Sequence, residues 1–424
     1  MMLSLTIWGG ACEHGRSSYL LQHQNEAVLM DCGGKKESGG IYPRIDPSVA
    51  CRLKTVLLSH AHEDHSMALP LLYKYGYKGV VWTSRATALR LPGYYRAWKS
   101  YAASYGLTLP YDDRDIARVR YAYLEDAGEA GDWIEAAPGV KMMWGRSGHM
   151  PGSVWYALDW CGRLIFFSGD YSEESQVLAA DRPRLDRAAD LSIIDAACGA
   201  DPDTQEDKLR ALHEATGDTL SRGRSVLFPV PVHGRGQELL LWAHHRFSQV
   251  PLIVDGELLA PLRELVKQRY WLREHSAEQL EALLRSPRVA VAGNNAERAR
   301  LLSLTGAKLI FTAGGMMETE CAQWYCRYMK NTGGGLVMLT GHLGRGSFGA
   351  RLLAQEDEAL QVLRVRYKVH QGLPDVRRML AAVPSHATVL VHAARTPTVE
   401  LLELLQQEGH SGLYALEPGD TLVC

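Results

Sequence analysis

Hydrophobic and polar positions divide the chain into two kinds of pattern, and the first covers about 200 residues. Short apolar runs separated by turns predict strands at residues 3–8, 19–21, 27–31, 55–59, 79–83, 140–144, 153–158 and 163–168. Helical patterns lie between several of these runs, notably after His65 and from Ser84 into a tyrosine-rich segment at 94–105. Strands combined with covering helices indicate a layered α/β or α+β fold.

The pattern changes near Asp201, where strands begin to alternate with helices. Expected strand–helix pairs lie at 225–232 and 237–247, 251–254 and 257–270, 289–292 and 296–304, and 308–312 and 318–329, with a further strand at 335–340. This rhythm predicts a parallel sheet and therefore a second domain. The last part predicts strands at 362–369 and 388–392 around a helix at 375–382, then a helix at 396–408.

Composition narrows the class of protein. The chain has 424 residues, of which 46% are hydrophobic and 22% charged, as in a globular protein with two domains or one domain with a large insertion. No apolar run reaches about 18 residues, so no membrane span is expected. The start lacks the basic residues of a signal peptide, and the eight cysteines are scattered, which favours a cytoplasmic location. A net charge of −2 gives no overall attraction for nucleic acid, although a local basic groove is compatible with it.

The strongest chemical signal is the run from His60 to His65, which directly follows an apolar stretch at 55–58. It contains three histidines and two carboxylates in six positions. A single histidine is more often a core or surface residue, but four potential ligands at the end of one strand favour a metal site. Imidazole and carboxylate ligands suit zinc, manganese or iron.

Two later residues extend this ligand series. His149 and Asp170 each follow an apolar run, and each alone is a weak signal, because a loop histidine is often solvated and an aspartate after Ser-Gly is often a turn residue. Their order after His60–His65 resembles the metallo-β-lactamase superfamily. Its members have an HxHxDH loop, then a histidine, then an aspartate that bridges two metals, and a final histidine. Asp31 would orient the ligands in this scheme.

The remaining sequence resembles the β-CASP nucleases, a branch of that superfamily, almost from end to end. The matching stretches are 191–199 with Asp195 as the acid, 229–240 with Arg-x-Gln-Glu-Leu, the glycine turns at 313–317 and 340–349, 368–372 around His370, and 389–392 ending in His392. The resemblance implies an α/β fold. We expect an αββα metallo-β-lactamase sandwich from residues 1–200 and 360–424, with an inserted β-CASP domain at 201–359.

The resemblance also implies a ligand set and roles for other residues. Two Zn²⁺ ions are expected, with Mn²⁺ or iron as alternatives. One would be bound by His60, His62 and His149, the other by Asp64, His65 and His392, and Asp170 would bridge them. Two metals about 3.5–4 Å apart would share a hydroxide and clamp the attacked group.

Catalytic and substrate-binding roles follow from the same resemblance. His370 would protonate the leaving oxygen, and Asp195 would orient the His370 ring. Asp64 would be both a metal ligand and a member of the catalytic set. A helix cap is the alternative role for His370. Phosphates would be held by Arg235, Arg345, Ser347 and the backbone at Gly315.

These expectations favour a metal-dependent nuclease, with single-stranded RNA bound in a cleft between the domains. Endonuclease and exonuclease modes both stay open, and so does a homodimer. One alternative is a hydrolase of a small ester, thioester, lactam or nucleotide. It is favoured by the near-neutral charge, the lack of an appended RNA-binding module, and departures from the branch pattern at Cys198, Lys368, Gln371–Gly372, Ala393–Ala394 and Glu318–Glu320. A second alternative is an inactive subunit that binds RNA or protein.

Overall fold

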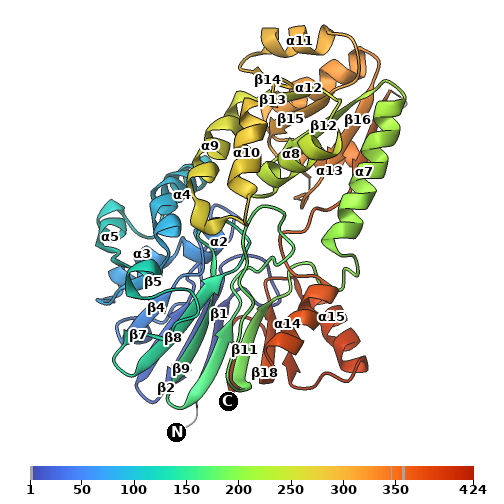
Figure 1. Ribbon diagram of the computed structural model, residues 1–424. Helices are drawn as coiled ribbons and strands as arrows, with labels where there is room; N and C mark the ends of the chain where they lie inside the picture. The colour runs from blue at the N-terminus through green and yellow to red at the C-terminus, as the bar shows by residue number, and fades with distance from the viewer. Residues whose placement is uncertain (1–2, 345, 356–358) are drawn as a thin grey trace. The chain divides into compact units, whose positions relative to one another are not determined.

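The computed structural model describes residues 3–344, 346–355 and 359–424, and the chain divides into two compact units (Figure 1). Unit 1 contains Met1–Glu173, Ala179–Pro202 and His370–Cys424. Unit 2 contains Glu174–Leu178 and Asp203–Val369.

Unit 1 is built on two seven-stranded sheets in the described part of the chain. The first has the order β20-β1-β2-β3-β4-β5-β6, with β1 (Ser4–Gly9), β2 (Ser18–His23), β3 (Glu26–Met30), β4 (Leu53–Leu57), β5 (Val81–Thr83), β6 (Tyr121–Tyr123) and β20 (Thr421–Val423). The second has the order β19-β18-β11-β10-β9-β8-β7, with β7 (Ile134–Ala137), β8 (Val140–Arg146), β9 (Val154–Trp160), β10 (Arg163–Phe167), β11 (Ala189–Asp195), β18 (Ser385–Val391) and β19 (Leu413–Tyr414).

The two sheets of unit 1 face each other across a buried layer. Tyr19 of β2 packs edge-on against Phe167 of β10, with ring centroids 5.5 Å apart. The Tyr156 hydroxyl of β9 donates a hydrogen bond of 2.9 Å to the carbonyl of Leu58, which follows β4. Several strands are buried on both faces, as a sheet between two apolar layers requires.

Helices cover the outer faces of these sheets (Figure 1). Unit 1 has the helices α1 (Pro47–Ala50), α2 (Glu63–Ser66), α3 (Leu69–Lys74), α4 (Arg85–Ser104), α5 (Asp113–Arg118), α6 (Leu124–Ala127), α14 (Leu373–Ala382) and α15 (Arg395–Gln407). Leu72 of α3 and Trp98 of α4 join the core on the outer face of the first sheet. Val376 of α14 and Leu401 of α15 join the core on the outer face of the second. Unit 1 therefore has the αββα layers of the metallo-β-lactamase fold.

Unit 2 contains a parallel sheet of six strands within the described residues, in the order β14-β13-β15-β12-β16-β17. The strands are β12 (Ser225–Val230), β13 (Leu252–Asp255), β14 (Val289–Ala292), β15 (Leu309–Ala313), β16 (Gly335–Leu339) and β17 (Leu360–Arg364). Its helices are α7 (Gln205–Ser221), α8 (Arg235–Arg246), α9 (Leu259–Lys267), α10 (Ser276–Arg285), α11 (Asn295–Ser303), α12 (Glu320–Asn331) and α13 (Phe348–Leu353), with 3₁₀ turns at Gly256–Leu258 and Arg269–Trp271.

Both faces of this sheet are covered, because successive residues of its strands point to opposite sides. Val226 and Phe228 of β12 pack with residues of α7, α8, α9 and α10. Leu227, between them, packs with residues of α11, α12 and α13. This arrangement explains why the strands read as continuous apolar runs in the sequence.

The structure differs from the sequence-based boundaries at two places. We expected the inserted domain to end at residue 359, but unit 2 continues to Val369, because β17 pairs in parallel with β16. Residues 174–178 also belong to unit 2. They are held there by Glu238, whose carboxylate accepts hydrogen bonds from the Ser175 hydroxyl at 2.6 Å and the Gln176 amide at 2.7 Å. Neither pairing can be inferred from local hydrophobic periodicity.

Candidate metal centre and active site

The His60–His65 loop follows β4 and runs into α2, and its backbone is held by the loops before β2 and after β3. The amides of Ser17 and Cys32 donate hydrogen bonds to the carbonyls of Asp64 at 2.7 Å and His65 at 2.8 Å. A Cβ atom at Gly33 would lie 1.7 Å from the Asp64 carbonyl oxygen. Only glycine therefore allows this close approach, which fixes the path of the ligand-bearing loop.

Asp31 orients two of the candidate ligands. Its buried carboxylate accepts hydrogen bonds from the Ser59 amide and hydroxyl and from His65 Nδ1, each at 2.7 Å. The Ser59 hydroxyl in turn lies 3.0 Å from His60 Nδ1. The Nδ1 atoms of His60 and His65 are thus engaged in hydrogen bonds outside the site, and their Nε2 atoms point toward its centre.

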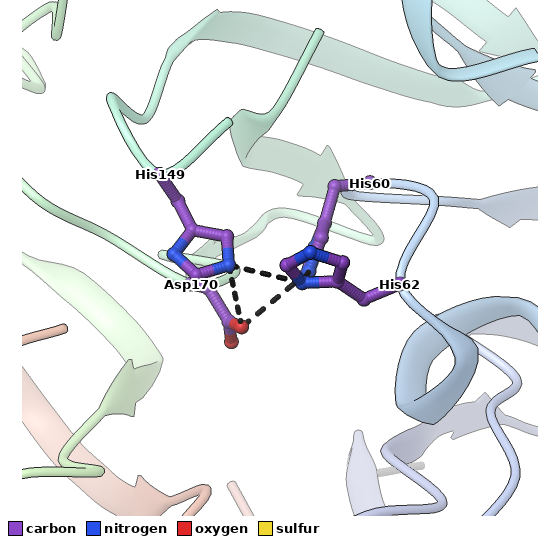
Figure 2. A group of neighbouring side chains, drawn as sticks. All are labelled: His60, His62, His149 and Asp170. Carbon is purple, nitrogen blue, oxygen red and sulfur yellow. Dashed lines mark hydrogen bonds and ion pairs between the residues drawn. The ribbon is translucent and has the colours of Figure 1, made fainter. Parts of the chain in front are cut away.

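The first donor group combines His60, His62, His149 and Asp170 (Figure 2). His62 Nδ1 lies 3.0 Å from His60 Nε2 and 3.1 Å from His149 Nε2. The Oδ2 atom of Asp170 lies 3.4 Å from His60 Nε2 and 3.5 Å from His149 Nε2. These three imidazoles and one carboxylate come from the loops after β4, β8 and β10.

The second donor group combines Asp64, His65 and His392, with the other oxygen of Asp170 beside it. His392 Nε2 lies 3.1 Å from both His65 Nε2 and Asp64 Oδ2. Asp170 Oδ1 lies 3.3 Å from His65 Nε2 and 3.6 Å from His392 Nε2. Asp170 thus presents a different oxygen to each group.

The spacing of these donors fits metal ions. A tetrahedral ion with ligand distances of about 2.0–2.1 Å has donors about 3.3–3.4 Å apart. The measured separations in the two groups scatter around this value, from 3.0 to 3.5 Å in the first and from 3.1 to 3.7 Å in the second. Several of them join two imidazole nitrogens, an arrangement that a shared cation stabilises better than a proton does. Both groups could therefore hold a divalent metal.

The electrostatics of the two groups differ. Burial lowers the pKa of His60, and it lowers the pKa of His62 to about 3, so both present neutral nitrogens. Burial alone would also lower the pKa of His392, but the carboxylates of Asp170 and Asp64 outweigh it and raise this pKa to about 9. Without metal, a proton on His392 thus compensates carboxylates that a cation would otherwise neutralise.

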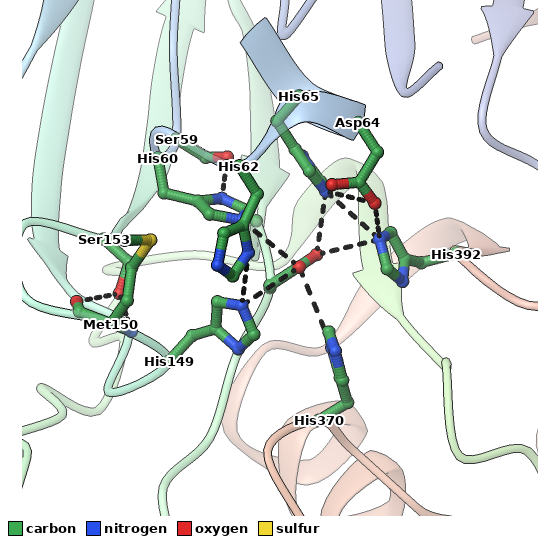
Figure 3. Close-up of polar contacts among 12 residues, drawn as sticks. Ser59, His60, His62, Asp64, His65, His149, Met150, Ser153, His370 and His392 are labelled. Atoms are coloured by element: carbon green, nitrogen blue, oxygen red, sulfur yellow. Dashed lines mark hydrogen bonds and ion pairs between the residues drawn. The ribbon is translucent and has the colours of Figure 1, made fainter. Parts of the chain in front are cut away.

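His370 lies beside these groups (Figure 3), and Asp195 lies near His370, Asp170 and His392. His370 Nδ1 lies 3.1 Å from Asp195 Oδ2, and the His370 ring stacks on His392 with centroids 5.0 Å apart. Asp195 is buried at the end of β11, where it accepts hydrogen bonds from the amides of Tyr171 and Ala197. The His370 side chain keeps 19% exposure. The structure therefore brings together every sequence-predicted metal and catalytic residue.

The residues predicted to bind substrate belong to unit 2. Arg235 begins α8, and its Nη2 atom would lie 3.3 Å from a Cβ atom at Gly315. Ser347 caps α13, where its hydroxyl accepts a hydrogen bond from the Ala350 amide. A helix-capping role thus accounts for Ser347 without substrate. Arg345 lies outside the described residues.

Two residues near the site were given no role from the sequence. Ser59 links Asp31 to His60, and its only sequence signal is its position directly before the first histidine. His14 Nδ1 lies 3.1 Å from the backbone carbonyl of His392, which has a left-handed φ of 71°. No local pattern in the sequence indicates that residue 14 reaches residue 392.

Fold and donor groups together are similar to those of metallohydrolases of the metallo-β-lactamase type. Residues 13–159 match the family model of the metallo-beta-lactamase superfamily. The chain is 26% identical to Ribonuclease TTHA0252 of Thermus thermophilus, over 96% of this chain and 97% of that protein. It is 24% identical to Probable RNase MJ4 of Methanocaldococcus jannaschii, over 97% and 98% of the two chains. These relatives are of the β-CASP type, as the sequence motifs predicted.

Two further similarities are more limited. The chain is 27% identical to Transcription termination factor FttA of Methanothermobacter thermautotrophicus over 86% of its own length, but it spans only 61% of that protein. A crystal structure of a protein of unknown function from Enterococcus faecalis V583 superposes over the whole of both chains, with a TM-score of 0.57 and 14% identity. That likeness concerns the fold alone. Among the described helices, none combines the length and apolar character needed to cross a membrane.

Proposed function

We propose that the protein is a metal-dependent ribonuclease with two zinc ions. The observation that carries this proposal is the shared carboxylate, because Asp170 directs one oxygen to each of two donor groups whose spacing fits a tetrahedral ion. Two-metal sites are typical of enzymes that cleave phosphodiesters. The relatives named ribonucleases, similar over nearly the whole chain, favour RNA as the substrate.

In this proposal His60, His62 and His149 bind one ion, and Asp64, His65 and His392 bind the other, with Asp170 between them. The donor set of imidazole and carboxylate suits zinc, and manganese or iron would also fit. When bound, the pair of ions would lower the pKa of a coordinated water and neutralise charge on the phosphate.

His370 is proposed as the general acid. The leaving group of a phosphodiester is a strong alkoxide, which needs a proton as the bond breaks. The hydrogen bond between His370 Nδ1 and Asp195 leaves the other ring nitrogen available to carry that proton. Asp195 would hold the ring, because backbone amides already fix its carboxylate.

The test compares substrates with poor and good leaving groups. Metal-loaded protein should cleave labelled single-stranded RNA. The His370→Ala variant should keep its metal and lose about 10²–10⁴-fold in rate on RNA, but lose less on a nitrophenyl phosphodiester, which leaves without a proton. Single-stranded DNA and a generic ester complete the panel.

Each alternative has its own result. Hydrolysis of the ester without cleavage of either nucleic acid would replace the nuclease by a small-molecule hydrolase. Equal losses on both phosphodiesters, with reduced metal content, would make His370 a metal ligand instead. A protein that binds two ions and cleaves none of these substrates would be the inactive binding subunit.

A further inference from the structure

The sheet of unit 2 has a topological switch point between the neighbouring strands β12 and β16. After β12 the chain continues through α8 to β13, on one side of the pair. After β16 it continues through α13 to β17, on the other side. In open parallel sheets, the carboxyl ends of two such strands form the usual place for a ligand.

Four basic side chains at this place lie close enough for their charges to act on one another, and we call them the switch-point cluster: Arg235, His342, Arg364 and Arg366. Arg235 is the first residue of α8, and Arg364 is the last residue of β17. The guanidinium of Arg235 packs against the backbone of Gly341, where a Cβ atom would lie 2.1 Å from its Nη2 atom. Arg364 Nε donates a hydrogen bond of 3.1 Å to the carbonyl of the same glycine. Two positive side chains therefore converge on one residue at the end of β16.

The three arginines of the cluster have no ion pair with a carboxylate among the described residues, and Arg364 instead donates its Nε hydrogen to the carbonyl of Gly341. Burial and the charge of Arg366 lower the pKa of Arg235 to about 10, and the same two causes lower the pKa of Arg364. The arginines thus affect one another as like charges.

The acidic residue of α8, Glu238, already accepts hydrogen bonds from other residues of unit 2. The Glu238 carboxylate is buried and accepts hydrogen bonds from Ser175 and Gln176. It also accepts a hydrogen bond of 2.5 Å from the Tyr367 hydroxyl. Two buried polar atoms in the cluster's surroundings also have no hydrogen-bond partner among the described residues, Arg235 Nε and Thr340 Oγ1. An arrangement of this kind costs free energy unless an anion completes it.

We infer that the switch-point cluster binds a phosphate group of a nucleic-acid strand. Guanidinium groups suit phosphate because each can donate two parallel hydrogen bonds. Of the four cluster residues, only Arg235 is assigned a phosphate-binding role from the sequence, and the structure adds His342, Arg364 and Arg366. The nature of the strand rests on the proposed function, but the presence of an anion site does not.

The experiment measures binding of a short labelled single-stranded RNA to the full-length chain after chelation of metal, so that cleavage plays no part. Arg364→Gln and Arg366→Gln are compared with Arg300→Gln, which removes an equal charge from an exposed position on α11. Each cluster variant should weaken binding about tenfold, as expected for a lost charged hydrogen bond. It should also reduce the salt slope of log K by about 0.7 for each lost phosphate contact. The control should change neither.

Competition with inorganic phosphate and with a nucleoside monophosphate distinguishes the sources of the phosphate. Weak competition by both, at concentrations far above that of the RNA, supports a strand. Displacement of the RNA by either small anion at comparable concentration would overturn the strand and leave a small-phosphate site. Cluster variants that bind RNA like Arg300→Gln would overturn the site itself. Failure of the metal-loaded wild type to cleave RNA would refute the proposed function but leave this binding result intact.

Discussion

Replacing Asp170 by alanine tests the idea that one carboxylate serves two metal ions. Asp170 Oδ2 lies 3.4 Å from His60 Nε2, and Oδ1 lies 3.3 Å from His65 Nε2. The substitution therefore removes one donor from each group at once. Replacing His62 removes a donor from the first group only, since its contacts in the site are to His60 and His149.

The size of the effect follows from the number of donors. Zinc sites with four protein ligands have apparent binding free energies of about 10–16 kcal/mol, or roughly 2.5–4 kcal/mol for each ligand. Losing one donor in each group should thus weaken both ions by roughly 10²–10³-fold. His62→Ala should weaken one ion by this amount and leave the other near its original affinity.

The assay is zinc titration against a competing chelator, combined with measurement of the metal content after dialysis. Wild-type protein should retain close to two ions per chain, His62→Ala close to one, and Asp170→Ala fewer than one. Circular dichroism of each variant controls for loss of the fold. If Asp170→Ala retains two ions, or loses only one while the other keeps its affinity, the bridging role is refuted.

Three further predictions follow from the same geometry. Asp31→Asn removes no donor but loosens His65, so metal affinity should fall about 10–100-fold in the chelator assay, and an unchanged affinity would show that Asp31 does not orient the site. Because the pKa of His392 is about 9 without metal, zinc binding near neutral pH should release protons. Zinc affinity should therefore rise with pH toward about 9, as an indicator dye and titrations at several pH values would show, whereas a pH-independent affinity would contradict it. Gly341→Ala should displace the Arg235 guanidinium and weaken RNA binding without changing net charge, and binding equal to wild type would argue against this packing.

Much of the site could be predicted because its ligands lie close together in the sequence or at the ends of apolar runs. His60 to His65 occupy one loop after one strand, so their proximity requires no knowledge of the fold. His149, Asp170 and His392 each follow an apolar run. The order of the ligands in the metallo-β-lactamase superfamily linked these three residues to the His60–His65 loop. The αββα fold and the inserted domain could be predicted from the resemblance to β-CASP proteins, because that resemblance also rests on short motifs.

The tertiary structure decided what depends on contacts between distant residues. His65 and His392 are 327 positions apart and follow strands of different sheets, β4 and β18, so only the packing of these two sheets brings their rings together. The sequence could name Asp170 as a bridge but not show which oxygen faces which group, because that depends on how β10 lies against the first sheet's loops.

The same limit applies to unit 2. The run that begins at Leu360 reads as a strand in either domain, and its hydrogen bonds to β16 assigned it to the second sheet. The switch-point cluster could not be predicted from the sequence either. Arg235 and Arg364 lie close together only because β12, β16 and β17 are neighbouring strands in the sheet. Local sequence thus determined the ligands and the elements, because hydrophobic periodicity and loop chemistry act over a few residues. Strand order and the packing of the sheets determined which of them became neighbours, because both depend on contacts over the whole chain.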